Sequence, residues 1–137
     1  MYKRQVENLS LKNLKEELIK NNEKTIDEIF CDFLTVIDTF DRSEEAIKER
    51  GWGSEENTQK AIKRLLNAKK KALFVLEKYD VKPIVFDNNK ARDEWCITNG
   101  TEPDPHKENG EIITIEKEGY MRKDHVIRPA EVIVVKN

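Results

Sequence analysis

The sequence predicts an α+β protein in which two helices precede a small β domain. Apolar residues recur at every third or fourth position over residues 6–50, and again over residues 54–79. Beyond residue 83 this spacing gives way to short apolar runs separated by Asn, Asp, Gly and Pro. Charged residues make up 38% of the chain and hydrophobic residues 37%, a balance typical of long helices with a largely wet surface.

The first helix is expected over residues 6–50. Its apolar seam consists of Leu11, Leu14, Leu18, Ile26, Ile29, Phe33, Ile37 and Phe40. No proline or glycine interrupts the stretch, so a single helix of about 40 residues, roughly 60 Å long, is expected. A chain of this size has no body long enough to cover such a seam. We therefore expect two copies to pair along it as a homodimer.

The second helix is expected to begin near Ser54, after a short glycine-containing loop, and to run to about Tyr79. One face of it is predicted to carry the apolar residues Ile62, Leu65, Leu66, Leu73, Leu76 and Tyr79. Its other face carries Lys60, Lys63, Arg64, Lys69, Lys70 and Lys71. The short loop predicts an antiparallel hairpin. Residues 25–50 carry a net charge of −5 and residues 54–79 one of +4, so we expect the two segments to lie together.

Residues 1–80 are thus expected to form a helical dimerisation domain and residues 81–137 a small β domain. Strands are expected at residues 84–86, 112–115, 126–127 and 132–135. A polar, turn-rich stretch is expected at residues 87–110, and a further turn at Gly119-Tyr120. The last strand is apolar on both faces, which predicts a central position in its sheet.

Several function classes are disfavoured by composition. A net charge of −2 argues against electrostatic binding of nucleic acid. The first residues form no apolar signal region and no stretch approaches the length of a membrane span, so we expect a cytoplasmic location without membrane association. The spacing of Cys31 and Cys96 suggests neither a disulfide nor a metal site. No phosphate-binding glycine loop or nucleophile–base pair is evident, so we predict no enzyme and no cofactor.

Two stretches carry longer motifs. Residues 33–42 read Phe-Leu-Thr-Val-Ile-Asp-Thr-Phe-Asp-Arg and are followed by Glu44-Glu45-Ala46. Residues 119–134 read Gly-Tyr-Met-Arg-Lys-Asp-His-Val-Ile-Arg-Pro-Ala-Glu-Val-Ile-Val. Both resemble motifs of the GrpE family, nucleotide exchange factors of DnaK-type chaperones. The order of long helix, short helix and β domain is also similar, although the N-terminal helix is shorter than is usual in the family.

The resemblance implies a homodimer with paired long helices, a four-helix bundle made by the shorter helices, and one β domain per protomer. It also implies that the chain binds the ATPase domain of a DnaK-type chaperone and holds its nucleotide cleft open, so that ADP leaves. The contact residues that it implies are Arg42 and Glu45 in the first motif, Phe86, Met121, His125, Arg128 and Val134 in the β domain, and Lys12 and Lys20 on the long helix.

The chain departs from the family pattern at a few positions. Lys63-Arg64 replace a Glu-Gly pair, Asn88 stands where the family has proline, and His125 replaces an arginine. These departures motivate an alternative function, a dimeric chaperone-binding adaptor without exchange activity. A third hypothesis, from another class, is a small enzyme that uses Glu94, Cys96 and His106; only the residue types favour it.

Simpler interpretations also stand beside the proposed contacts. Arg42 could pair with Glu45 or Asp38 on its own helix. Arg128 could tie down a turn through hydrogen bonds. His125 could be an ordinary surface residue; as a contact it would weaken binding as rising pH removes its charge. Trp95 could be an exposed anchor or a core residue.

Overall fold

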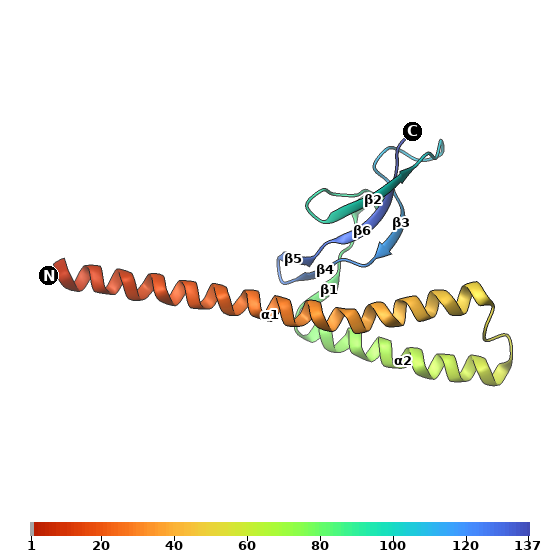
Figure 1. Cartoon of the computed structure of the whole chain (residues 1–137), viewed down its shortest axis with the longest axis horizontal. Coiled ribbons are helices and arrows are strands. Elements are labelled where there is room, and N and C mark those ends of the chain that lie inside the picture. Colours follow the sequence, from red (N-terminus) through yellow and green to blue (C-terminus); the bar gives the residue numbers. More distant parts are fainter. Residues whose placement is uncertain (1) are drawn as a thin grey trace.

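The computed structural model describes residues 2–137, with side chains from residue 7 onward. Two helices come first, α1 (Tyr2–Arg50) and α2 (Glu56–Lys78). The strands are β1 (Val81–Pro83), β2 (Cys96–Glu102), β3 (Ile112–Lys117), β4 (Tyr120–Arg122), β5 (His125–Arg128) and β6 (Ala130–Val135), with a short 3₁₀ turn, η1 (Asp87–Asn89), after β1. Figure 1 shows a helical hairpin with the β domain standing on the middle of α1. The predicted α+β class is confirmed.

α1 is one continuous helix of 49 residues and ends where the sequence predicts. Gly51 adopts a φ of 66°, which glycine reaches without the clash of a Cβ atom. Its N–H bonds to the carbonyl of Lys48 at 3.3 Å, and the N–H of Trp52 bonds to the carbonyl of Ile47 at 3.1 Å. This pair of bonds is a Schellman motif, which satisfies the last carbonyls of the helix.

α2 folds back antiparallel along the second half of α1 (Figure 1), as the short loop predicts. The predicted charge pairing is confirmed at Lys69, whose Nζ lies 2.6 Å from Asp41 Oδ1 and 2.5 Å from Glu44 Oε1. The predicted apolar face of α2 is only partly buried within the chain. Leu76 is buried in the core that also holds Val81 and Tyr120, whereas Leu65 is 68% exposed. Tyr79 is 61% exposed, although its ring lies 5.9 Å from the ring of Phe30 on α1.

The strands form two three-stranded sheets. The first has the order β1-β4-β5 and is antiparallel throughout. The second has the order β2-β6-β3, in which β6 runs parallel to β2 and antiparallel to β3. The prediction that the last strand is central is therefore confirmed, and the strands expected near residues 112–115 and 126–127 are present as β3 and β5.

Three predictions about the β domain are wrong. The strand expected at residues 84–86 lies earlier, at β1, because the chain leaves the first sheet after Pro83 and crosses to the second. The stretch expected to be only turns contains β2, an edge strand whose largely polar side chains stay in solvent. Tyr120 begins β4 instead of a turn; the turn lies between β4 and β5, where Lys123 has a φ of 56°.

Two apolar cores hold the molecule together. The first joins both helices to the first sheet and contains Leu34, Ile37, Leu76, Val81 and Tyr120. Ile37, expected in the dimer seam, is therefore fully buried within its own chain. The second core lies in the other sheet and contains Ile112, Ala130, Val132 and Val134.

The two sheets meet at Gly119. A Cβ atom there would lie 2.5 Å from the backbone nitrogen of Ala130 and 2.7 Å from Ile84 Cδ1. Ile84 also donates its N–H to the Gly119 carbonyl at 3.0 Å. A side chain larger than hydrogen would therefore push the sheets apart.

Candidate functional site

The β domain rests on α1 through charged side chains of β4 and β5. Arg122 is only 4% exposed. Its guanidinium contacts the carboxylate of Glu23, and its Nε donates to Asp27 Oδ1 at 2.6 Å. Asp27 also lies beside His125, with 2.7 Å between Oδ2 and Nε2. The carboxylate of Asp27 on α1 therefore bonds to two side chains of the β domain.

A second anchor lies further along α1. Arg128 forms a bidentate pair with Asp38, with Nη1–Oδ2 and Nη2–Oδ1 distances of 2.7 and 2.8 Å. Its Nε also donates to the carbonyl of Glu118 at 3.0 Å. Between the anchors, the thiol of Cys31 donates to the carbonyl of Ile127 at 3.1 Å. Glu23, Asp27, Cys31 and Asp38 follow helical spacing, so one face of α1 carries all four.

Burial and hydrogen bonding act in opposite directions on these groups. Burial disfavours the charge of Asp27, but the hydrogen bonds from Arg122 and His125 outweigh it and lower the pKa of that carboxyl. The hydrogen bond from Arg122 likewise lowers the pKa of Glu23. Burial raises the pKa of Tyr120 to about 12. The two carboxylates that face Arg122 therefore stay charged at neutral pH.

Beside these anchors, the β domain and the two helices border an open cleft of about 730 Å³. The helical wall includes Asp38, Asp41, Arg42 and Glu45 on α1 and Lys69 on α2. The opposite wall includes Ile115, Glu116, Lys117, Glu118, Tyr120 and Glu131. Carboxylates outnumber cations on both walls, so the cleft is acidic.

A model of the GrpE family matches residues 2–136, which is essentially the whole chain. The chain belongs to the GrpE family. The comparison with curated proteins gave no match. GrpE proteins are co-chaperones that serve as nucleotide exchange factors in protein folding, and membership supports that role for this chain in general terms.

Two of the contact residues predicted from the GrpE motifs lie together on the cleft. Arg42 and Glu45 are exposed on α1 and both line it. The pairing of Arg42 with Asp38 or Glu45 is not seen; Arg42 Nη2 instead lies 3.5 Å from Thr39 Oγ1. Direct contact of Arg42 and Glu45 with a chaperone stays a prediction, and their exposure is compatible with it.

His125 and Arg128 are engaged within the chain. His125 is exposed but faces Asp27, whereas Arg128 is held by Asp38 and the Glu118 carbonyl. Arg128 therefore makes the hydrogen bonds that the simpler interpretation expects, here to the carbonyl of Glu118 just before β4. It also joins β5 to α1 through Asp38. Met121, on β4, is half-buried. Contact of these three residues with a chaperone stays a prediction.

Phe86 and Val134 have packing roles in the β domain. Val134 is 9% exposed in the second core, and Phe86 packs against that core. The ring of Phe86 lies 6.1 Å from the ring of Trp95, which also stacks against the Arg92 guanidinium at 4.0 Å. Trp95 is thus a half-buried packing residue of the β domain. A chaperone contact by Phe86 or Val134 stays a prediction.

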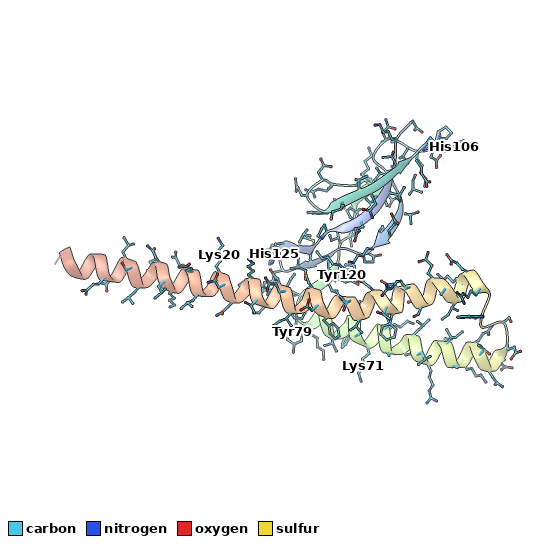
Figure 2. The ribbon with its side chains drawn as sticks, in the orientation of Figure 1. Lys20, Lys71, Tyr79, His106, Tyr120 and His125 are labelled. Carbon is cyan, nitrogen blue, oxygen red and sulfur yellow. The ribbon has the colours of Figure 1, made fainter. Side chains whose placement is uncertain are left out.

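The remaining predicted contacts lie on the exposed N-terminal half of α1. Lys12 and Lys20 have exposed side chains. Figure 2 shows Lys20 on the part of the helix that extends past the β domain, on the side away from α2. Both lysines are therefore separated from the cleft, and any role in binding must involve a partner that extends along the helix.

The residues of the enzyme hypothesis are not brought together. Cys96 opens β2 and His106 lies beyond the other end of that strand, which spans about 20 Å over its length. Figure 2 shows His106 at the far tip of the β domain. Burial raises the pKa of the Cys96 thiol, which makes it a poorer nucleophile. Within residues 2–137, no group of three or more His, Cys, Asp or Glu side chains could hold a metal ion.

The backbone conformation at Asn88 explains why proline is absent from this position. Asn88 and Asn89 have φ values of 54° and 56°. Proline is locked near −65° and cannot adopt this conformation, whereas asparagine tolerates it. The amide of Asn89 donates to the carbonyl of Ile112 at 2.9 Å, which fixes the turn on the sheet.

Sequence reasoning missed Arg122 and its partners Glu23 and Asp27. The only signal was a pair of carboxylates four residues apart on a helix, which lie on one face but are common on solvated helices. None of the helices described here is long and apolar enough to cross a membrane.

Proposed function

We propose that two copies of this chain form a cytoplasmic nucleotide exchange factor that binds the ATPase domain of a DnaK-type chaperone. The factor favours the open conformation of the ATPase domain and so speeds the release of ADP. The match of the GrpE family model to residues 2–136 carries this proposal. The residues of the chain need to perform no covalent chemistry, since the factor only changes the population of chaperone conformations.

Exposed apolar side chains on α1 support the dimer. Leu11, Leu14, Leu18, Ile26, Ile29 and Phe33 are each at least 36% exposed. Residues 11 to 33 extend over about 33 Å of helix, which is more apolar surface than a monomer commonly leaves in water. A second α1 offers the same length and spacing. On α2, Leu65 and Phe74 are exposed as well and could pack in the four-helix bundle that the family resemblance implies.

The cleft supports the proposal that the ATPase domain is held between the helices and the β domain. Arg42 and Glu45 stand on the helical wall, and the β domain supplies the other wall. A partner that touches both walls at once is bound at a fixed angle to α1. Such two-sided contact is what an exchange factor needs to hold a second protein in one conformation.

The adaptor without exchange activity remains the second candidate, and one observation favours it. His125, expected as a contact and standing where the family has an arginine, instead faces Asp27 of α1, with 2.7 Å between Nε2 and Oδ2. If a contact at this position contributes to opening the ATPase domain, the chain could bind its partner without driving ADP release.

The release of fluorescent ADP from a cognate DnaK tests the proposal. The wild-type dimer should accelerate release, and Arg42→Ala should weaken binding by about tenfold, the cost of losing an exposed interface arginine. Lys48→Ala is the matched control, because Lys48 is a nearby exposed cation of α1 outside the cleft lining. Binding without faster release would establish the adaptor. A folded dimer that neither binds nor accelerates release would refute both candidates.

A further inference from the structure

The polar connection between α1 and the β domain comes from one small part of that domain. Within the described residues, the ion pairs and side-chain hydrogen bonds from α1 to the β domain go to β4, β5 and the turn between them. The other sheet, β2-β6-β3, has its own core and joins the first at Gly119. The β4–β5 hairpin is therefore the base on which the rest of the domain stands, as Figure 1 shows.

The two anchors lie at separate points along α1. Arg122 meets Asp27 and Glu23, and Arg128 meets Asp38. Asp27 and Asp38 are about 16 Å apart along the helix axis. An attachment at one point would allow the β domain to swivel, whereas attachment at two points fixes its angle.

Between the anchors, α1 and the β domain are joined by apolar packing. Tyr120 is 2% exposed and packs in the core formed with Leu34 and Ile37. Apolar packing is non-directional and stabilises the docking without selecting one orientation. The bidentate and charge-assisted hydrogen bonds are directional and so select the orientation.

We propose that Arg122 and Arg128, with Glu23, Asp27 and Asp38, are positioning residues that set the angle between the β domain and α1. This angle determines the separation of the two cleft walls, and so the surface offered to the ATPase domain. The inference rests on the proposed function for its consequence in binding, but the angle itself is a property of the free chain.

These residues set the angle through their bonds to α1 and need touch no partner to do so. Arg122 is 4% exposed and its guanidinium is turned onto α1, so a partner could reach it only after the ion pairs had broken. Arg128 is 12% exposed at its side chain and is saturated by Asp38 and Glu118. Loss of the acidic partners on α1 should therefore alter binding although no contact with the ATPase domain is removed.

The test removes the carboxylates at one anchor and measures the angle directly. Glu23→Gln with Asp27→Asn leaves Arg122 without its charged partners. The matched control is Glu28→Gln with Asp32→Asn, which removes the same charge from exposed positions on the same stretch of α1. Spin labels are attached through ketone-bearing amino acids at Ser43 and Thr101, both exposed, so that the native cysteines are kept. Labelled chains are diluted with unlabelled chains, so that electron–electron resonance reports distances within one protomer.

The wild type and the control should give one narrow distance distribution. The Glu23→Gln/Asp27→Asn variant should give a broader or shifted distribution, with its helical circular dichroism unchanged. Its affinity for the ATPase domain should fall about tenfold if the competent angle is populated about a tenth of the time. An unchanged distance distribution, or a broadened one with unchanged affinity, overturns the proposal. If the wild type does not bind at all, the proposed function fails, while the distances still decide whether the ion pairs fix the angle.

Discussion

Removing the Arg128–Asp38 pair should reveal a strong coupling between β5 and α1. Arg128→Met deletes two charge-assisted hydrogen bonds of 2.7 and 2.8 Å and the bonds to the carbonyl of Glu118. It leaves the carboxylate of Asp38, whose side chain is 17% exposed, without its partner. Breaking a fully buried pair costs roughly 3–5 kcal/mol, and the partial access of water reduces our expectation to about 2–3 kcal/mol.

A double-mutant cycle isolates the pair itself. Asp38→Asn keeps the shape and should cost about 1–2 kcal/mol, because an amide oxygen still accepts one hydrogen bond. The double variant should cost about 2 kcal/mol less than the sum of the two single variants, which is the coupling expected of a charge-assisted bidentate pair. The surface pair Lys117–Glu131, at 3.8 Å and with both side chains at least 34% exposed, is the matched control. Its coupling should be below about 0.5 kcal/mol.

Trp95 provides the signal for this measurement. It is half-buried in the β domain, and replacing the exposed Trp52 by phenylalanine leaves it as the reporter of that domain. Urea unfolding at one fixed protein concentration gives the free energies, since the stability of a dimer depends on concentration. A coupling for Arg128–Asp38 as small as that of the surface pair would refute the idea that this bond holds β5 on α1.

Three further predictions concern the cores and the dimer. Gly119→Ala should destabilise the β domain by about 1–3 kcal/mol or more in urea unfolding, because the new methyl group would lie 2.5 Å from a backbone nitrogen. Since burial raises the pKa of Tyr120 from 10.0 to about 12, the folded chain should lose about 3 kcal/mol of stability as the pH rises between these values, and Tyr120→Phe should remove that loss. Leu14→Glu with Leu18→Glu should halve the solution mass in sedimentation, whereas Lys15→Glu should not; equal masses would contradict the seam.

The helices could be predicted from the sequence because their signals are local. Apolar spacing, the absence of helix breakers and the glycine at position 51 fixed the course and the end of α1. The burial of the apolar face of α2 was predicted less well, because it depends on the β domain, which covers α2 near Leu76. Leu65 and Leu76 look equivalent in the sequence but are 68% and 2% exposed.

The β domain was harder to predict because its elements depend on distant partners. β2 is a strand by virtue of its parallel pairing with β6, and its own polar sequence gives little indication of it. The ion pair between Arg122 and Asp27 joins residues 95 positions apart, and spacing along the chain cannot reveal such a contact. The candidate cleft was predicted only in part, through Arg42 and Glu45 on its helical wall.

The C-terminal motif is better explained by folding than by partner contact. Gly119 permits the close approach of the two sheets, Tyr120 fills the first core, and Val132 fills the second. Arg122 and Arg128 attach the hairpin to α1. Because these positions are needed to place the β domain on the helix, an exchange factor and an adaptor require them equally. The residues that distinguish the two functions should therefore lie among the exposed side chains of the cleft, and the substitutions that separate binding from ADP release should be found there.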